Sequence, residues 1–193
     1  MSKEEKQHNP RTSTFQMTLV GLMAAVTCIL APMSIPLPGG VPISLTNFVI
    51  YLTVFLLGWK KGTLSYCIYL LIGLVGLPVF SGFSGGIGKL AGPTGGYLIG
   101  FIFMAAISGY FIEAFPGKIY MSIMGMVLGT VVDYICGTVW FMMQTQMTLG
   151  ATLATCVFPF LIGDALKIVI ATLTGPILRQ YLVKAGAFTF NSN

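Results

Sequence analysis

Charged side chains are scarce in this sequence. Lys, Arg, Asp and Glu make up 8% of its 193 residues, whereas a soluble domain carries about 25% charged residues. Apolar residues make up 55%, so the chain lacks the polar groups that would cover a surface in water. This composition excludes an ordinary soluble protein and indicates an integral membrane protein surrounded by lipid.

Several motifs of enzymes are also absent. The single histidine, His8, lies near the N-terminus, so the apolar part of the chain has no histidine for a metal site or a Ser–His pair. The run 85–89 ends in Leu90 and not in Ser or Thr, which excludes ATP binding by a P-loop. No C-x-x-C pair occurs among the four cysteines, which favours free buried thiols (Cys28, Cys67, Cys136 and Cys156). We therefore expect no enzyme activity, no cofactor and no metal ion.

What the sequence does contain is a series of apolar runs. A transmembrane helix needs about 20 apolar residues, and the candidate spans are about 15–31, 44–57, 63–77, 94–114, 119–142 and 151–182. The second and third are short for a crossing, which implies tilt or cover by protein. Proline, glycine or polar residues dominate three intervening segments, at about 32–43, 78–93 and 143–150. The sequence predicts an all-α membrane protein with six transmembrane helices in 15–184 and polar tails at 1–14 and 185–193.

The distribution of positive charge predicts the orientation. With a cytoplasmic N-terminus, the outer side holds only Lys89, and the inner side holds Lys3, Lys6, Arg11, Lys60, Lys61, Lys118, Arg179 and Lys184. This is the asymmetry of the positive-inside rule, so we expect both termini in the cytoplasm and the three intervening segments outside. The same placement accounts for the net charge of +5 without a nucleic-acid partner. The first span has no small-x-small cleavage site, so we expect it to be retained.

Three charged residues fall well within predicted spans: Asp133, Asp164 and Lys167. Each costs about 2.5–3.5 kcal/mol near a helix centre, so such residues usually face a cavity or a partner. Asp164 and Lys167 lie three residues apart on one helix face, where they form either a private ion pair or a site for a polar ligand. Asp133 shares a stripe of residues four apart, which fits either close helix packing or the same ligand site (Gly125, Gly129 and Gly137).

Two further features offer candidate contacts. The first helix has small residues at Gly21, Ala24, Ala25 and Cys28, and this small face docks either inside the protein or against another membrane protein. Among the aromatic residues near the outer surface, Phe83 lies within a glycine-rich segment and is the best candidate for contact with a ligand.

The stretch Gly85-Gly86-Ile87-Gly88-Lys89-Leu90-Ala91-Gly92-Pro93-Thr94-Gly95-Gly96-Tyr97 closely resembles the signature of BioY proteins. These are the biotin-specific S components of energy-coupling-factor transporters, and the resemblance covers nearly the whole chain, including six spans and the charged pair in the last. It implies an S-component-like helical bundle in a prokaryotic plasma membrane that captures biotin from outside. It also implies a separate transmembrane coupling subunit and two cytoplasmic ATPases, which fits the missing P-loop.

The resemblance assigns roles to the candidate residues. Asp164 is expected to accept a ureido N–H of biotin, and Lys167 to meet the ureido carbonyl or another polar end. The loop at Gly85 and Gly86 is expected to close over the ligand with Phe83 against its rings, and the other candidates for substrate binding are Thr94, Tyr97 and Asp133. The small face of the first helix is expected to dock on the coupling subunit, through Ala24 and Cys28 or through Gly21 and Ala25.

Three alternatives stay open on the sequence alone. The first is an S component for another vitamin, the second is a stand-alone carrier or channel for a small solute, and the third is a structural membrane anchor. Binding of biotin compared with other vitamins separates the first alternative. Flux through liposomes that contain this protein alone separates the second. Tolerance to replacement of both Asp164 and Lys167 separates the third.

Overall fold

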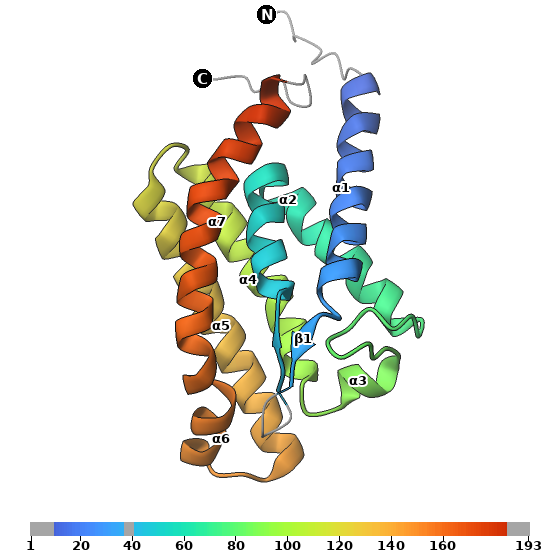
Figure 1. The fold of residues 1–193 in the computed structure, drawn as a ribbon, viewed down its shortest axis with the longest axis vertical. Helices are drawn as coiled ribbons and strands as arrows, with labels where there is room; N and C mark the ends of the chain where they lie inside the picture. The colour runs from blue at the N-terminus through green and yellow to red at the C-terminus, as the bar shows by residue number, and fades with distance from the viewer. Residues whose placement is uncertain (1–9, 37–40, 185–193) are drawn as a thin grey trace, which may run out of the picture.

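The computed structural model describes residues 10–36 and 41–184, and it is a bundle of helices with one short β-hairpin (Figure 1). The long helices are α1 (Pro10–Leu30), α2 (Thr46–Leu74), α4 (Gly95–Ala114), α5 (Ile119–Thr145) and α7 (Phe158–Lys184). The short elements are β1 (Ser34–Ile35), β2 (Ile43–Ser44), α3 (Ile87–Ala91) and α6 (Leu149–Cys156). The predicted helical bundle is confirmed, although Ser34–Ile35 and Ile43–Ser44, at the ends of the predicted intervening segment 32–43, form the antiparallel pair β1–β2.

Three helices, α4, α5 and α7, are long and apolar enough to cross a bilayer, and a shorter apolar helix covers Thr14–Leu30. The segment predicted as a polar tail, 1–14, in fact ends inside α1, which begins at Pro10. Proline suits the first turn of a helix because its missing N–H would have no partner there. Residues 1–9 and the predicted tail 185–193 lie outside the described residues.

The two ends of the bundle differ in charge. The start of α1, the end of α7, a bend in α2 and the α4–α5 turn lie together at the upper end in Figure 1. We call this the basic end, because its described cations are Lys60, Lys61, Lys118, Arg179 and Lys184. The β-hairpin, α3 and the α5–α6 turn lie at the opposite end, which we call the hairpin end.

Helix α2 covers most of both short predicted spans, 44–57 and 63–77, although Ser44 belongs to β2 and residues 75–77 follow the helix. Its backbone leaves helical geometry at Gly58, with φ 76° and ψ 179°, a conformation open to glycine. A Cβ at Gly62 would lie 3.1 Å from the Cα of Val54, so the two halves turn back on each other. The Trp59 N–H donates to the Glu113 carboxylate at 3.1 Å, which fastens the bend to the end of α4.

Helices α4 and α5 pack closely along the glycine stripe that the sequence predicted. A Cβ at Gly125 would lie 2.4 Å from the Cβ of Phe111, and one at Gly137 would lie 2.2 Å from the ring of Tyr97. From the other side, Gly100 of α4 leaves room for Asp133, whose Oδ1 would lie 2.3 Å from a Cβ there. The stripe therefore seats a carboxyl group at the centre of the α4–α5 contact.

The prediction of one continuous helix over 151–182 is wrong. The segment is two helices, α6 and α7, separated at Val157, which has φ −124° and ψ −59°. Pro159 explains the break, because proline cannot donate to the preceding turn and disfavours helical geometry at Phe158. Asp164 therefore lies six residues from the start of its helix, or about 9 Å at 1.5 Å per residue. The intervening segment 78–93, which is rich in glycine, contains the short helix α3.

Candidate functional site

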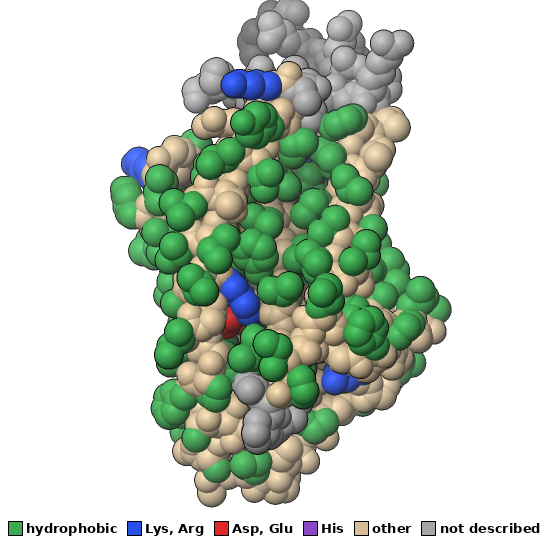
Figure 2. Space-filling model, in the orientation of Figure 1, with side chains coloured by type: hydrophobic (Ala, Val, Ile, Leu, Met, Phe, Trp, Pro, Cys, Tyr) green, Lys and Arg blue, Asp and Glu red, His purple; other side chains and the backbone are tan. Residues whose placement is uncertain are grey.

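Asp164 and Lys167 form an ion pair on α7, with 3.1 Å between Lys167 Nζ and Asp164 Oδ1. Both side chains are largely buried, at 9% and 12% exposure. Figure 2 shows an acidic and a basic side chain next to each other, midway along a largely apolar face. Removing two charges from water carries a large cost, which the pair recovers only if its remaining lone pairs and protons are also satisfied.

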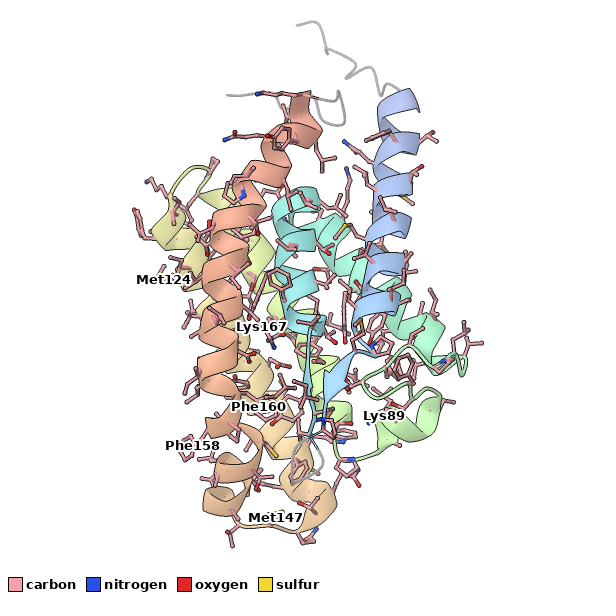
Figure 3. All side chains as sticks on the ribbon, viewed as in Figure 1. Lys89, Met124, Met147, Phe158, Phe160 and Lys167 are labelled. Carbon is pink, nitrogen blue, oxygen red and sulfur yellow. The ribbon has the colours of Figure 1, made fainter. Side chains whose placement is uncertain are left out.

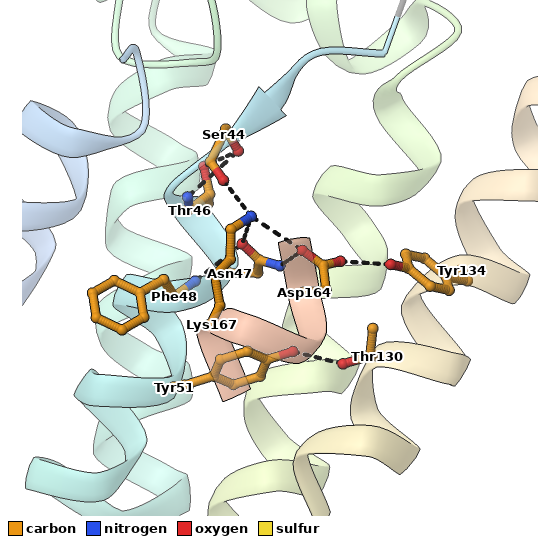
Figure 4. A network of polar contacts seen from close by, with 9 residues as sticks. All are labelled: Ser44, Thr46, Asn47, Phe48, Tyr51, Thr130, Tyr134, Asp164 and Lys167. Atoms are coloured by element: carbon orange, nitrogen blue, oxygen red, sulfur yellow. Dashed lines mark hydrogen bonds and ion pairs between the residues drawn. The ribbon is translucent and has the colours of Figure 1, made fainter. Parts of the chain in front are cut away.

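Asn47, the second residue of α2, joins the two charges (Figure 4). Its Nδ2 donates to Asp164 Oδ1 at 2.7 Å, and its Oδ1 accepts from Lys167 Nζ at 2.9 Å. The same Oδ1 accepts from the backbone N–H of Phe48 at 3.1 Å. The amide thus bonds to both charged groups and ties α7 to the start of α2.

The network extends to β2 and α5. Lys167 Nζ donates to the backbone carbonyl of Ser44 at 2.7 Å, so all three ammonium protons have acceptors. The Tyr134 hydroxyl donates to Asp164 Oδ2 at 2.6 Å, so both carboxylate oxygens are occupied. The ion pair is therefore shared among four elements and is not private to α7.

A pocket lies on the hairpin-end side of this network. The polar lining of the pocket includes Asn47, Asp164 and Lys167. Apolar and aromatic side chains form other parts of its wall (Val41, Phe80, Leu98, Phe101 and Phe160). Figure 3 shows Lys167 midway along the molecule and Lys89 nearer the hairpin end.

Lys89 of α3 supplies a second cation to the pocket. Burial in the α2–α4 connection lowers the pKa of its ammonium group, because loss of water disfavours the charged form. Among the residues that the structure describes, no carboxylate forms an ion pair with Lys89. An anionic group entering the pocket would meet a partly desolvated positive charge.

The structure brings five of the sequence-predicted residues to this pocket: Thr94, Tyr97, Asp133, Asp164 and Lys167. The other three lie in the loop outside it. Phe83 is 69% exposed, a Cβ at Gly85 would meet the carbonyl of Leu77 at 2.2 Å, and the Gly86 N–H donates to Gly73 at 2.7 Å. Contact between Phe83 and a ligand in the pocket therefore requires movement of the loop.

Sequence reasoning missed Asn47, Tyr134 and Lys89 as site residues. A carboxamide in an apolar span was the available signal for Asn47, since an amide buried in lipid needs partners. Tyr134 adjoins Asp133 in sequence but sits around the helix from it, toward α7. Lys89 was counted for topology, and its position as the one predicted outer cation was the signal for an anion contact.

The small face of α1 divides into two sides. Ala24 is 1% exposed and packs inward, and Cys28 is partly buried. Gly21 and Ala25 are exposed, and a Cβ at Gly21 would meet nothing within 4 Å. The surface that α1 presents outward therefore runs through Gly21 and Ala25.

Comparison with known proteins gives one consistent family. The BioY family model matches residues 3–184. The biotin transporter BioY of Thermotoga maritima is 36% identical over 170 residues, which cover 88% of this chain and 98% of that protein. The biotin transporter BioY2 of Lactococcus lactis is 29% identical over 93% of this chain and 98% of its own length. The crystal structure of the S-component for biotin from an ECF-type ABC transporter superposes with a TM-score of 0.83 at 28% identity, covering 89% of this chain and 94% of that one.

The burial of the Asp164–Lys167 ion pair leads us to predict how its variants change the stability of the protein. Lys167→Met leaves the buried Asp164 carboxylate without a cation and should lower the free energy of unfolding by about 3–5 kcal/mol. Asp164→Asn combined with Lys167→Met should recover part of that loss, because no uncompensated charge stays buried. Unfolding in detergent by SDS titration checks this, with the exposed Lys118→Met at the basic end as a control. A double variant whose loss of unfolding free energy equals the sum of the losses in Asp164→Asn and Lys167→Met alone would contradict the coupling between the two charges.

Proposed function

The chain belongs to the BioY family, and from this membership we propose that it captures biotin as the substrate-binding S component of an energy-coupling-factor importer. Relatives named as biotin transporters and a solved biotin S-component support the substrate. The observation that carries the proposal is the pocket, which places an ionised acceptor beside two donors at one point and a second cation at another.

The charged end of the pocket matches the ureido ring of biotin. That ring has two N–H donors and one carbonyl acceptor within a few ångströms. The site provides the complementary groups, with Asp164 as acceptor and Lys167 and Asn47 as donors. Binding exchanges the bonds already present: a ureido N–H takes a place on the Asp164 carboxylate, and Lys167 turns from Ser44 toward the ureido carbonyl. Because bonds are exchanged and not added, this end selects the ligand more than it holds it.

Apolar burial then supplies the affinity. The thiophane ring and the four methylenes of the valeryl chain fit the apolar walls of the pocket, which include Phe80, Phe101 and Phe160. At about 0.8 kcal/mol per buried methylene, burial of the four methylenes of the valeryl group contributes about 3 kcal/mol to binding. The carboxylate at its end lies within reach of Lys89, whose ammonium group has no carboxylate partner among the described residues.

The proposed topology has six spans in residues 15–184, with the two halves of α2 as separate crossings and both termini in the cytoplasm. Its support is the gathering of Lys60, Lys61, Lys118, Arg179 and Lys184 at the basic end, as the positive-inside rule requires of the cytoplasmic side. The hairpin end then faces outward in a prokaryotic plasma membrane, and the pocket opens toward the outside.

In this proposal the chain performs no chemistry, and two ATPase subunits and a coupling subunit supply the energy for transport. The outward small face of α1 at Gly21 and Ala25 is the proposed contact with the coupling subunit. Small residues let two helix backbones approach closely in a membrane, where lipid offers no hydrophobic drive for association.

Affinity for biotin and for its uncharged amide tests the assignment of both ends of the pocket. Lys89→Met should weaken biotin by about 10- to 100-fold, the worth of one charge-assisted bond, and leave the amide nearly unchanged. The Asp164→Asn, Lys167→Met double variant should weaken both ligands, and Lys118→Met should weaken neither. Calorimetric titration of folded protein in detergent measures these affinities. Equal loss of biotin and amide in Lys89→Met would contradict the carboxylate contact, and a wild-type protein that binds no biotin would refute the function.

The docking face has its own test. Gly21→Leu with Ala25→Leu should abolish copurification with a coexpressed energy-coupling module and leave biotin affinity intact, because the bulky side chains hold the partner backbone away. Ala154→Leu, on an exposed site of α6, is the matched control and should copurify normally. Undiminished assembly of the Gly21, Ala25 double variant would exclude this face as the contact.

A further inference from the structure

Asp133 is the one acidic residue of the pocket that the network around Asp164 does not engage. Its side chain is 3% exposed, and its Oδ1 is buried without a hydrogen-bond partner. Among the described residues only two other buried side-chain atoms share this condition, and both are threonine hydroxyls (Thr63 and Thr138). Asp133 also lines the pocket with Asp164 and Lys167. A buried carboxyl oxygen without a hydrogen-bond partner is costly and calls for a physical explanation.

The seat of Asp133 offers no compensating charge. On the α4 side its Oδ1 packs against Gly100, where a Cβ would lie 2.3 Å away. The titratable groups that interact electrostatically with Asp133 are Tyr51 and Tyr66 of α2, Tyr97 of α4, Tyr134 and Cys136 of α5, and Asp164 of α7. Lys167 and Lys89 line the same pocket. The three protons of Lys167 already lie on Ser44, Asn47 and Asp164. What remains nearby is the negative charge of Asp164 itself.

We infer that Asp133 is a neutral carboxylic acid whose O–H is a hydrogen-bond donor to the ligand. A second ionised carboxylate here would be buried, unpaired and next to a like charge, whereas the neutral acid leaves only an uncharged polar group unsatisfied. A neutral carboxyl group has one O–H donor. Because Oδ1 lies against Gly100, this O–H is on Oδ2, and the pocket that Asp133 lines is where it finds an acceptor. The inference rests on the proposed function for the identity of that acceptor, an uncharged oxygen such as the ureido carbonyl of biotin.

The two acids of the pocket thereby have opposite roles. Asp164, compensated by Lys167, Asn47 and Tyr134, is an ionised acceptor. Asp133 is a donor with an uncharged partner. A ureido group presents donors and an acceptor in one plane, so this division selects it over ligands that carry only donors or only acceptors.

Infrared difference spectroscopy tests the protonation of Asp133 without any ligand. Wild-type protein minus Asp133→Asn should show the C=O stretching band of a protonated carboxyl group, shifted by ¹³C-labelled aspartate, at neutral pH. Addition of biotin should move that band to lower frequency as the O–H becomes bonded. A difference spectrum with only carboxylate bands, or a band that biotin leaves in place, would overturn the inference.

Affinity provides a second test. Asp133→Asn keeps a neutral side chain with a donor and should bind biotin within about threefold of the wild type, whereas Asp133→Leu should bind about tenfold more weakly for want of one buried hydrogen bond. Asp164→Asn is the matched comparison and should lose more than Asp133→Asn. Thermal unfolding shows which variants are folded. Equal losses in Asp133→Asn and Asp133→Leu would overturn the donor role, whereas a wild-type protein that binds no biotin would refute the proposed function and leave the ligand-free infrared band to decide the protonation.

Discussion

The Asp164–Lys167 pair is the constraint around which the site is organised, because two charges in an apolar bundle must be compensated completely. The neutral amide of Asn47 forms hydrogen bonds with both charged groups. The Ser44 carbonyl accepts a hydrogen bond from Lys167, and the Tyr134 hydroxyl donates one to the second carboxylate oxygen. These partners come from β2, α2 and α5, so satisfying the pair also sets the position of α7 against the rest of the bundle. In the proposed function, stability and ligand recognition therefore draw on the same hydrogen bonds.

Close helix packing makes this arrangement possible. The glycines of α4 and α5 bring the two backbones together, and Gly100 leaves the space in which Asp133 sits. The break at Pro159 shortens the path from the hairpin end to Asp164. The pocket therefore lies between the hairpin end and the polar network, which forms its floor.

Much of the pocket could be predicted from sequence, because a charged side chain within a membrane has a high free-energy cost and is therefore rare. Asp133, Asp164 and Lys167 stood out by type alone, and all three line the pocket. Asn47 and Tyr134 were missed because neutral polar residues are common in spans and their partners lie far away in sequence. The exposure of Phe83 and the outward turn of Gly21 and Ala25 depend on how the loop and α1 are rotated, which local patterns do not specify. The helix break was readable from Pro159, but continuous hydrophobicity across it favoured one long span.

The proposed function places biotin in the pocket on the hairpin-end side of the Asp164–Lys167 pair. Mass spectrometry of small molecules released by heat from the detergent-purified protein tests it most directly, with wild type and the Asp164→Asn, Lys167→Met double variant prepared from the same biotin-containing cells. We expect biotin in amounts close to one molecule per wild-type chain and little in the folded double variant. A different small molecule in the wild type, or equal biotin in both proteins, would contradict it.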